Sequence, residues 1–407
     1  MLNKNGIREL AYIVQIDDIL PIEGSDNCEC AVVGGWHIMV RRNTLKKGDY
    51  AVYFEIDSKL PKKAPFDFLA SKHYKIKTQK YTFGGKGNFI SQGLLMSFDD
   101  FDSNEKWLID FKEKKEVPYF LTKELEVTYA TAEDNTRKNN SNTDKFVKMK
   151  NRHQKLFKDN KIVQWLWEKQ WGKRILFLFL GNKQDKKGFP SWVKKTDEER
   201  CQNLPCLFSD PENIEWIVTE KIDGSSTTFT YKRKGKNKGF YVCSRNVCFD
   251  TPEKTEKCYY STNIYLEMAE KYDIERKLKE IAKNLNVEYV TLQGETFGDG
   301  VQKRTYGMKN GEHDFRAFNF IIKEKGKEPI RYGSDMMRDY LEIYGIPSVP
   351  ILDTHFKLPK TCDEMLEYAE GNSVLDGEPR EGVVLRTPDG ERSFKAVSNS
   401  FLIAYHQ

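Results

Sequence analysis

The chain has 407 residues, of which 39% are hydrophobic and 13% aromatic, and this is enough to build the cores of two or three domains. Its 66 basic and 61 acidic side chains leave a net charge of only +5, which excludes a polycationic nucleic-acid coat and confines any nucleic-acid-binding face to a local patch. The eight cysteines include no Cys-x-x-Cys pair and the longest apolar run, Ile175 to Leu180, is too short to cross a bilayer, so we expect reduced thiols in a soluble, intracellular protein.

The first hundred residues predict short β-strands. Candidate strands are Ala31–Val33, Trp36–Val40 and Tyr50–Ile56, and the turn signals Gly34-Gly35 and Gly48-Asp49 lie between them. Short strands separated by glycine turns are typical of a small β-barrel.

The middle of the chain changes in composition. Residues 133–150 are polar and rich in Asn and Lys, so they lack the apolar content to bury a core and predict a linker. Apolar residues then return at helical spacing through Ile162, Trp165, Leu166 and Phe179, which predicts a helix packed on a core rather than a membrane or partner site.

From Thr196 onward the pattern mixes strands and helices. It predicts a strand that ends near Glu220 and a helix from about Ile264 to Asn284. Further strands are predicted near 289–295, 315–323 and 382–387, so we expect an α+β domain without an internal repeat.

Lys221 is the candidate nucleophile, inside Glu220-Lys221-Ile222-Asp223-Gly224. A Lys-x-Asp-Gly sequence alone occurs often by chance, and a solvated lysine at a strand end is the alternative. Five further segments follow it in order, namely Ser244–Asn246, Gln293–Gly298, Phe315–Phe320, Arg380–Leu385 and Phe394-Lys395. This ordered series resembles the motifs of the covalent nucleotidyltransferase superfamily, which contains ATP-dependent nucleic-acid ligases and mRNA capping enzymes.

The same residues make chemical sense for activation of a 5′-phosphate. A lysine amine that attacks the α-phosphate of ATP stores the adenylate as a covalent lysyl-adenylate. Only the neutral amine attacks, so its pKa must fall, and Lys395 with a divalent metal supplies positive charge for this. Asp223, Glu295 and Glu381 offer the hard oxygen ligands that hold Mg²⁺ or Mn²⁺, although surface salt bridges are the alternative for each carboxylate alone.

Other motif residues are expected to bind the nucleotide. Gly224 lacks a Cβ, which would let the backbone approach the nucleotide, and Phe318 is expected to stack on adenine, with a core aromatic as the alternative. The resemblance implies that Glu220 faces the adenine amino group, that Arg245 contacts the ribose or a phosphate, and that Glu295 contacts the ribose hydroxyl or the waters of the metal.

The order of domains selects a branch of the superfamily. Lys395 lies close to the end of the chain, Gln407, so we expect no C-terminal barrel of the kind found in DNA ligases and capping enzymes. Residues 16–61 and Thr196–Asn203 resemble the RNA ligase family that carries an N-terminal OB-fold module. In that family an arginine at the position of Arg200 contacts the triphosphate through its forked donors, whereas the alternative is a charge in an acidic turn.

The last motif departs from the family pattern. Many relatives have a second lysine two positions after Lys395, where this chain has Val397. Contacts to the α-phosphate beyond Lys395 are therefore not assigned.

We thus predict an OB-fold nucleic-acid-binding module over 1–130, a polar and helical connector over 131–195, and an α+β, ATP-grasp-like nucleotidyltransferase domain over 196–407. The predicted function is ATP-dependent RNA ligation by a monomer that seals 3′-OH and 5′-phosphate ends, with nicked duplex RNA as the substrate. RNA contacts are expected on the barrel from Arg41, Arg42, Lys46, Lys47 and the stretch Lys72–Lys86, with Tyr74, Tyr81 and Phe83 interleaved. The alternatives are a DNA ligase or guanylyltransferase of the same superfamily, or an RNA-binding protein whose transferase domain has decayed.

Overall fold

The computed structural model describes residues 1–130 except 4 and 86, 160–169, 172, 176, 187–209, 214–249 except 236 and 237, and 263–405. The chain divides into two compact units, one of Met1–Ala130 with Phe189–Gln407 and the other of Thr131–Gly188. No helix in these described ranges is long and apolar enough to cross a bilayer.

The smaller unit contains α5 (Lys161–Glu168) and β12 (Lys187–Gly188). Val163 and Leu176 are buried there against Leu166 and Trp167, so the predicted helix packs its apolar residues together. The predicted polar stretch 133–150 lies outside the described residues.

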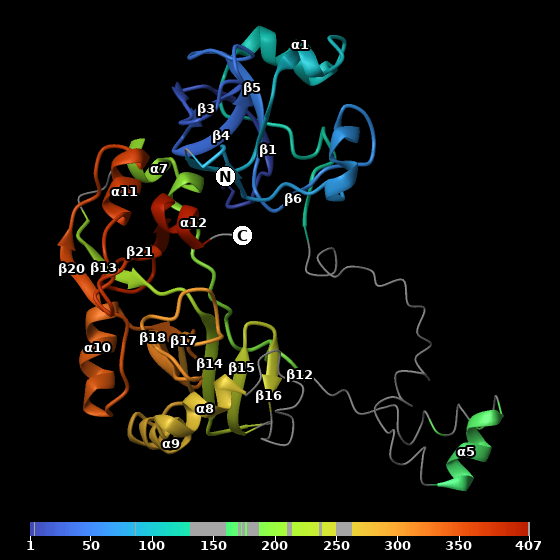
Figure 1. Ribbon diagram of the computed structural model, residues 1–407. Coiled ribbons are helices and arrows are strands. Elements are labelled where there is room, and N and C mark those ends of the chain that lie inside the picture. Colours follow the sequence, from blue (N-terminus) through green and yellow to red (C-terminus); the bar gives the residue numbers. More distant parts are fainter. Residues whose placement is uncertain are drawn as a thin grey trace. The chain divides into compact units, whose positions relative to one another are not determined.

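The N-terminal part of the larger unit is built mainly of short strands (Figure 1). The strands are β1 (Ala11–Gln15), β2 (Asp18–Pro21), β3 (Cys28–Val33), β4 (Trp36–Arg41), β5 (Tyr50–Phe54), β6 (Ser58–Lys59), β7 (Gln79–Thr82), β8 (Asn88–Ser91), β9 (Leu94–Met96), β10 (Tyr119–Phe120) and β11 (Thr128–Tyr129). The helices are α1 (Lys106–Lys114) and the 3-10 helices η1 (Phe66–Lys72) and η2 (Phe98–Asp100). The three predicted strands are confirmed as β3, β4 and β5.

Strand β1 shows how this part is held together. It lies between β10 and β5 in an antiparallel sheet of order β10-β1-β5-β9. Successive side chains of a strand point to opposite faces, and here Ala11 and Ile13 enter one apolar cluster while Tyr12 and Val14 enter another. The sheet is therefore buried on both faces, and the second sheet, β2-β3-β4, supplies Trp36 and Ile38 to the cluster around Tyr12.

The C-terminal part of the larger unit mixes strands and helices, as predicted. Its strands are β13 (Trp216–Lys221), β14 (Ser225–Lys232), β15 (Gly239–Ser244), β16 (Val247–Phe249), β17 (Tyr289–Gly298), β18 (His313–Lys323), β19 (Ile330–Arg331), β20 (Ile351–Phe356), β21 (Gly382–Arg386) and β22 (Ser393–Val397). Its helices are η3 (Cys201–Asn203), α7 (Cys206–Ser209), α8 (Ile264–Lys271), α9 (Ile274–Asn284), α10 (Ser334–Ile343), α11 (Cys362–Ala369) and α12 (Asn399–Tyr405).

The prediction of a single helix from Ile264 to Asn284 was wrong in one respect. The chain forms two helices there, α8 and α9, because Asp273 adopts a left-handed backbone conformation with φ of 49°. Both helices still bury apolar residues in one core, which includes Met268, Ile274 and Leu278.

Two antiparallel sheets frame the C-terminal part. The first contains the order β16-β15-β14-β17-β18-β19, and α8 and α9 cover one of its faces (Figure 1). The second has the order β20-β13-β21-β22 and packs on α11 through Val383, Phe394 and Met365. Strand β13 ends at Lys221, opposite Gly382 at the start of β21. This register places the residue before Gly382, Glu381, beside the candidate nucleophile.

Candidate active site

Lys221 and Glu381 form an ion pair at the ends of two neighbouring strands. Lys221 Nζ lies 2.5 Å from Glu381 Oε1, and the two side chains are 25% and 15% exposed. Burial acts to lower the pKa of Lys221, but the charges of Glu381, Glu295 and Asp223 outweigh it and raise that pKa above its usual value. The lowered pKa that the chemistry requires is therefore not a property of the free protein, because three carboxylates surround the amine.

Glu295 and Asp223 complete a cluster of acidic groups around Lys221. Burial and the neighbouring charges of Glu381 and Asp223 raise the pKa of Glu295 to about 8 against the opposing effect of Lys221. Burial and Glu381 likewise raise the pKa of Asp223 to about 6. Burial is the main cause of both raised pKa values and the neighbouring carboxyl groups add to it, so a cation bound among these groups would favour their ionised forms.

The cluster nevertheless does not form a complete cage of protein ligands. No group of three or more His, Cys, Asp or Glu side chains in the described parts of the chain is arranged to hold a metal ion by itself. One buried oxygen, Glu381 Oε2, has no hydrogen-bond partner there, and hard carboxylate oxygens suit Mg²⁺ or Mn²⁺. The residues fit a cation whose remaining ligands are water or phosphate.

A cavity of about 320 Å³ opens beside Lys221. Its lining includes Phe318 from β18 and Val384 from β21, which offer an apolar surface, and the polar groups of Arg245, Glu295 and Lys395. The cavity thus brings together residues from all six of the predicted motifs, that of Lys221 and the five that follow it.

Glu220 lines the same cavity but is already engaged. Its buried carboxylate accepts a short hydrogen bond from Ser373 Oγ and another from Val374 N at 2.9 Å. These two hydrogen bonds hold the carboxylate against the 373–374 loop, and the expected contact with the adenine amino group stays a prediction.

Gly224 lines the cavity, where its predicted approach to the nucleotide stays a prediction, and its position leaves no room for a side chain. A Cβ at this position would lie 2.4 Å from the backbone oxygen of Thr296 and 3.0 Å from Glu295 Cγ. The absent side chain lets the turn after Lys221 pack against β17, and thereby keeps Glu295 close to the candidate nucleophile.

Arg200 and Lys395 lie side by side. We call the two residues the phosphate arm, after the phosphate contacts that the sequence analysis expects of them. They form a parallel β-bridge, and Lys395 N donates a hydrogen bond of 2.7 Å to Glu199 O. Arg200 Nη1 is buried without a hydrogen-bond partner in the described residues, and the guanidinium carbon lies 5.7 Å from the centre of the Trp36 ring. Burial lowers the pKa of Lys395, with Lys221 and Arg200 adding to that effect and Asp197 opposing it.

Asp197 is a site residue that the sequence reasoning did not single out. Its carboxylate binds Arg245 at 2.7 Å and Lys395 at 3.3 Å, so it joins the two cationic residues. The segment Thr196–Asn203 was recognised by resemblance, but only Arg200 was selected from it. The acidic run Asp197-Glu198-Glu199 directly before Arg200 was the available signal.

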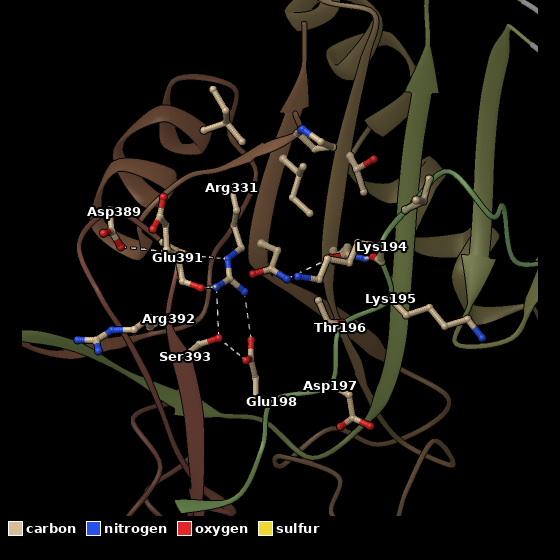
Figure 2. Close-up of a pocket in the computed structure, with 18 of the residues that line it drawn as sticks. Lys194, Lys195, Thr196, Asp197, Glu198, Arg331, Asp389, Glu391, Arg392 and Ser393 are labelled. Carbon is tan, nitrogen blue, oxygen red and sulfur yellow. Dashed lines mark hydrogen bonds and ion pairs between the residues drawn. The ribbon is translucent and has the colours of Figure 1, made fainter. Parts of the chain in front are cut away.

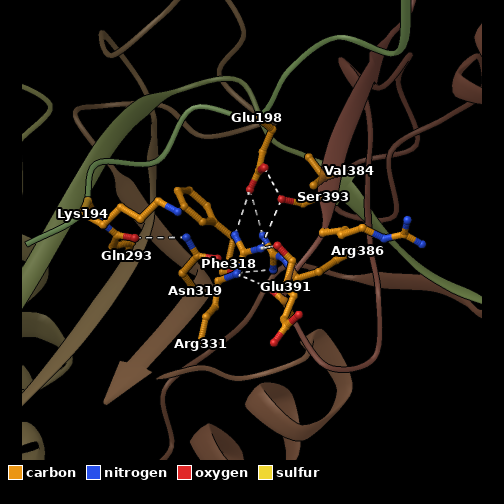
Figure 3. A network of polar contacts seen from close by, with 12 residues as sticks. Lys194, Glu198, Gln293, Phe318, Asn319, Arg331, Val384, Arg386, Glu391 and Ser393 are labelled. Atoms are coloured by element: carbon orange, nitrogen blue, oxygen red, sulfur yellow. Dashed lines mark hydrogen bonds and ion pairs between the residues drawn. The ribbon is translucent and has the colours of Figure 1, made fainter. Parts of the chain in front are cut away.

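A second, larger cavity of about 1070 Å³ adjoins the first and shares Thr196, Asp197 and Glu198 with it (Figure 2). Glu198 points there toward Arg331 and Ser393, and a network of polar contacts links these side chains to Arg386 (Figure 3). None of these four residues was predicted as functional.

The residues predicted to contact RNA vary in their availability. Arg41, Lys46 and Lys47 are exposed on the N-terminal part, whereas Lys75 is buried. Lys80 Nζ donates a short hydrogen bond to the carbonyl of Ile403 on α12. Lys86 lies outside the described residues. Lys47 is itself paired with Asp18 at 3.7 Å.

Comparisons with known proteins agree with this architecture. Residues 214–397 match the model of the RNA ligase family, and residues 10–97 match that of an OB-fold domain. No curated protein sequence matches the chain. A mutant Naegleria gruberi RNA ligase with ATP and Mn is 25% identical with a TM-score of 0.63, and the match covers 98% of this chain and 100% of that one.

Other structures of that ligase match almost as well. A mutant with AMP and Mn is 25% identical with a TM-score of 0.63 over 98% of this chain and 99% of that one. The enzyme with PPi is 24% identical with a TM-score of 0.61 over 97% and 98%. The predicted α+β fold with an N-terminal OB-type module is confirmed, and residues 214–397 of this chain form a domain of the RNA ligase family.

Proposed function

We propose that this RNA ligase uses ATP and Mg²⁺ or Mn²⁺ to form a lysyl-adenylate on Lys221, passes the adenylate to a 5′-phosphate, and seals the activated end with a 3′-OH. The observation that carries the proposal is that Lys221, Glu295, Phe318 and Lys395, from four separate segments, line one cavity. All of these residues come from one chain, which supports a monomer as the active species. The free thiols of the seven described cysteines suit a reducing compartment inside the cell.

The first step requires a neutral Lys221 amine. The ion pair with Glu381 orients Nζ but also favours the charged form, so the amine must be released from the acidic cluster before it attacks. Asp223, Glu295 and Glu381 would hold a divalent ion, directly or through water. Such an ion neutralises carboxylate charge and polarises the phosphate oxygens. In this arrangement Glu381 has two functions, since it holds the lysine at rest and contributes to the cation site.

The phosphate arm is placed to contact the triphosphate. Arg200 carries a buried N–H without a partner, and a phosphate oxygen would satisfy it through a charge-assisted hydrogen bond. Lys395, beside it, is expected to stabilise charge on the α-phosphate as the pyrophosphate leaves. Arg245, whose partner Asp197 is 61% exposed, can exchange that contact for the ribose or a phosphate.

The base is expected to lie between Phe318 and Val384, which both line the cavity. Stacking on an aromatic ring supplies binding energy for the base. Because the Glu220 carboxylate binds Ser373 and Val374, it would hold the wall of the base site, and its remaining lone pairs would accept a hydrogen bond from the adenine amino group.

The substrate is proposed to be a nicked RNA duplex with 3′-OH and 5′-phosphate ends, bound partly by the OB-fold domain. Exposed Arg41, Lys46 and Lys47 support phosphate contacts by that domain. The main alternative substrate is DNA, which the conserved chemistry of the superfamily would also allow.

Two measurements test the proposal. Full-length protein is incubated separately with radiolabelled ATP, GTP and NAD, and the labelled peptide is identified. We expect label from ATP alone, on Lys221. Nicked duplexes with matched RNA or DNA 3′-OH strands are then offered. Label on another residue, or an equal preference for both strands, would contradict the nucleophile or the substrate respectively.

A further inference from the structure

Glu198 is the centre of a largely buried network that joins three parts of the site (Figure 3). Its Oε1 accepts hydrogen bonds from Arg386 Nη2 at 3.2 Å and from Arg331 Nη1 at 3.5 Å. Its Oε2 accepts a short hydrogen bond from Ser393 Oγ. Each carboxylate oxygen is thus bound, and the contacts come from different strands.

The Arg386 guanidinium extends the network to the base site. Arg386 Nη1 donates a hydrogen bond of 2.7 Å to the carbonyl oxygen of Phe318 and one of 3.2 Å to Ser334 Oγ. The Arg386 side chain is only 2% exposed. The planar fork therefore holds the backbone of the residue expected to stack on adenine.

The other two partners of Glu198, Arg331 and Ser393, connect it to the phosphate arm. Glu198 lies two residues before Arg200 in the sequence, and Ser393 lies two residues before Lys395. The Glu198–Ser393 contact therefore supports the same pairing as the Arg200–Lys395 bridge. Arg331 strengthens it, since its Nη2 also donates to Ser393 Oγ at 3.2 Å.

The buried guanidinium of Arg386 needs a charged partner. Burial lowers the pKa of Arg386 to about 10, while Glu198 opposes that shift, so the arginine depends on this carboxylate as its charged partner. Removal of one member of such a pair leaves an uncompensated charge, and the remaining members must move or admit water. The network consequently transmits a displacement of Glu198 to both Phe318 and the phosphate arm.

Resting on the function proposed above, we propose that Glu198 is a positioning residue that sets the phosphate arm, Arg200 and Lys395, at the correct separation from the base site at Phe318. It does not touch the reacting atoms. ATP extends across both places, so its binding and reaction depend on that separation. The end of a pre-adenylated nick lacks the β- and γ-phosphates and depends on it less.

The test uses full-length wild type, Glu198→Gln, Ser393→Ala and Ser393→Thr. The matched control is Glu391→Gln, which removes an exposed carboxylate from the wall of the same larger cavity (Figure 2). That carboxylate makes no hydrogen bond or ion pair with any residue that the structure describes. For each protein we would measure single-turnover adenylation against ATP concentration, sealing of a pre-adenylated RNA nick, and the thermal unfolding temperature.

We expect Glu198→Gln and Ser393→Ala to raise the ATP concentration for half-maximal adenylation on the order of 10-fold or more, which is about 1.4 kcal/mol of ATP binding, because the phosphate arm and the base site would no longer fit one ATP molecule together. The rate of sealing of the pre-adenylated nick should fall much less. Ser393→Thr, which keeps a hydroxyl group, should need the same ATP concentration as wild type, and so should Glu391→Gln. Ser393→Ala guards against misfolding because it leaves no buried charge unpaired.

An unchanged ATP requirement in both variants would overturn the inference. Equal losses in adenylation and sealing, accompanied by a lower unfolding temperature, would also overturn it and show a purely structural role. A wild-type protein that forms no adduct on Lys221 would instead refute the proposed function itself, and with it this inference.

Discussion

The Lys221 ammonium lies 2.5 Å from the Glu381 carboxylate, because the pairing of Lys221 with Gly382 places Glu381 directly beside the end of β13. This relationship gives the free site a protonated, anchored lysine. A nucleophile in that state must exchange its carboxylate partner for a different electrostatic environment before it can attack a phosphate.

The identity of the nucleophile is tested by Lys221→Ala and Lys221→Arg. Both should abolish covalent adduct formation from ATP, since alanine has no amine and arginine stays protonated at any working pH. Gel detection of labelled protein provides the measurement, with Lys194→Arg as a control on the larger cavity wall. An adduct on either Lys221 variant would remove this residue from the nucleophilic role.

The pH dependence of Lys221 follows from the direction of its pKa. The acidic cluster raises that pKa, so in the free protein the amine becomes neutral only at a pH above the usual range for lysine. Glu381→Gln removes the nearest negative charge and should shift the midpoint to lower pH. The rate of reductive methylation of Lys221, followed by mass spectrometry against pH without ATP or metal, measures the shift. A midpoint that stays in place or rises would contradict the electrostatic account.

Binding of a divalent metal should release protons. At pH 7 a carboxyl group with a pKa of about 8 is mostly protonated, and Glu295 must ionise before it can take part in the cation site. Calorimetric titration of wild type with Mn²⁺ at pH 7, in buffers of different ionisation enthalpy, should show release of roughly one proton. Glu295→Gln should lose most of this buffer dependence. Equal heats in all buffers for wild type would rule out the coupling.

Gly224→Ala should destabilise the fold as well as the site. The added Cβ would lie 2.4 Å from Thr296 O, which belongs to the backbone of β17 and cannot rotate away. Overpacking of this kind costs about 1–3 kcal/mol. Chemical denaturation would measure the loss, and adenylation should fall because Glu295 is displaced. Wild-type stability together with wild-type adenylation would show that the turn has room for a side chain.

Strand preference separates an RNA ligase from a DNA ligase. The attacking 3′-OH must lie in line with the activated phosphate, and ribose pucker changes that placement, so A-form ends should react faster. A pre-adenylated nick with a few ribonucleotides at the 3′-OH end should therefore be sealed much faster than the all-DNA nick, whatever the 5′-phosphate strand. Comparable single-turnover rates for the two 3′-OH strands would favour the DNA ligase alternative.

The sequence by itself determined the features that depend on local pattern and on order along the chain. Short apolar runs separated by glycine turns predicted β3, β4 and β5, because strand periodicity and turn residues act over a few positions. The series of motifs from Lys221 to Lys395 predicted the family, since the order of the motifs is a property of the chain itself.

The tertiary structure alone decided how those residues act together. Three features depend on contacts between segments that are far apart in the sequence. They are the raised pKa of Lys221, the hydrogen bond from Ser373 to Glu220 and the ion pair between Glu198 and Arg386. Such contacts depend on sheet register and on burial, which no local propensity encodes. For the same reason the sequence could place Lys221 and Glu381 in one active site, but only the pairing of β13 with β21 could show that they form an ion pair.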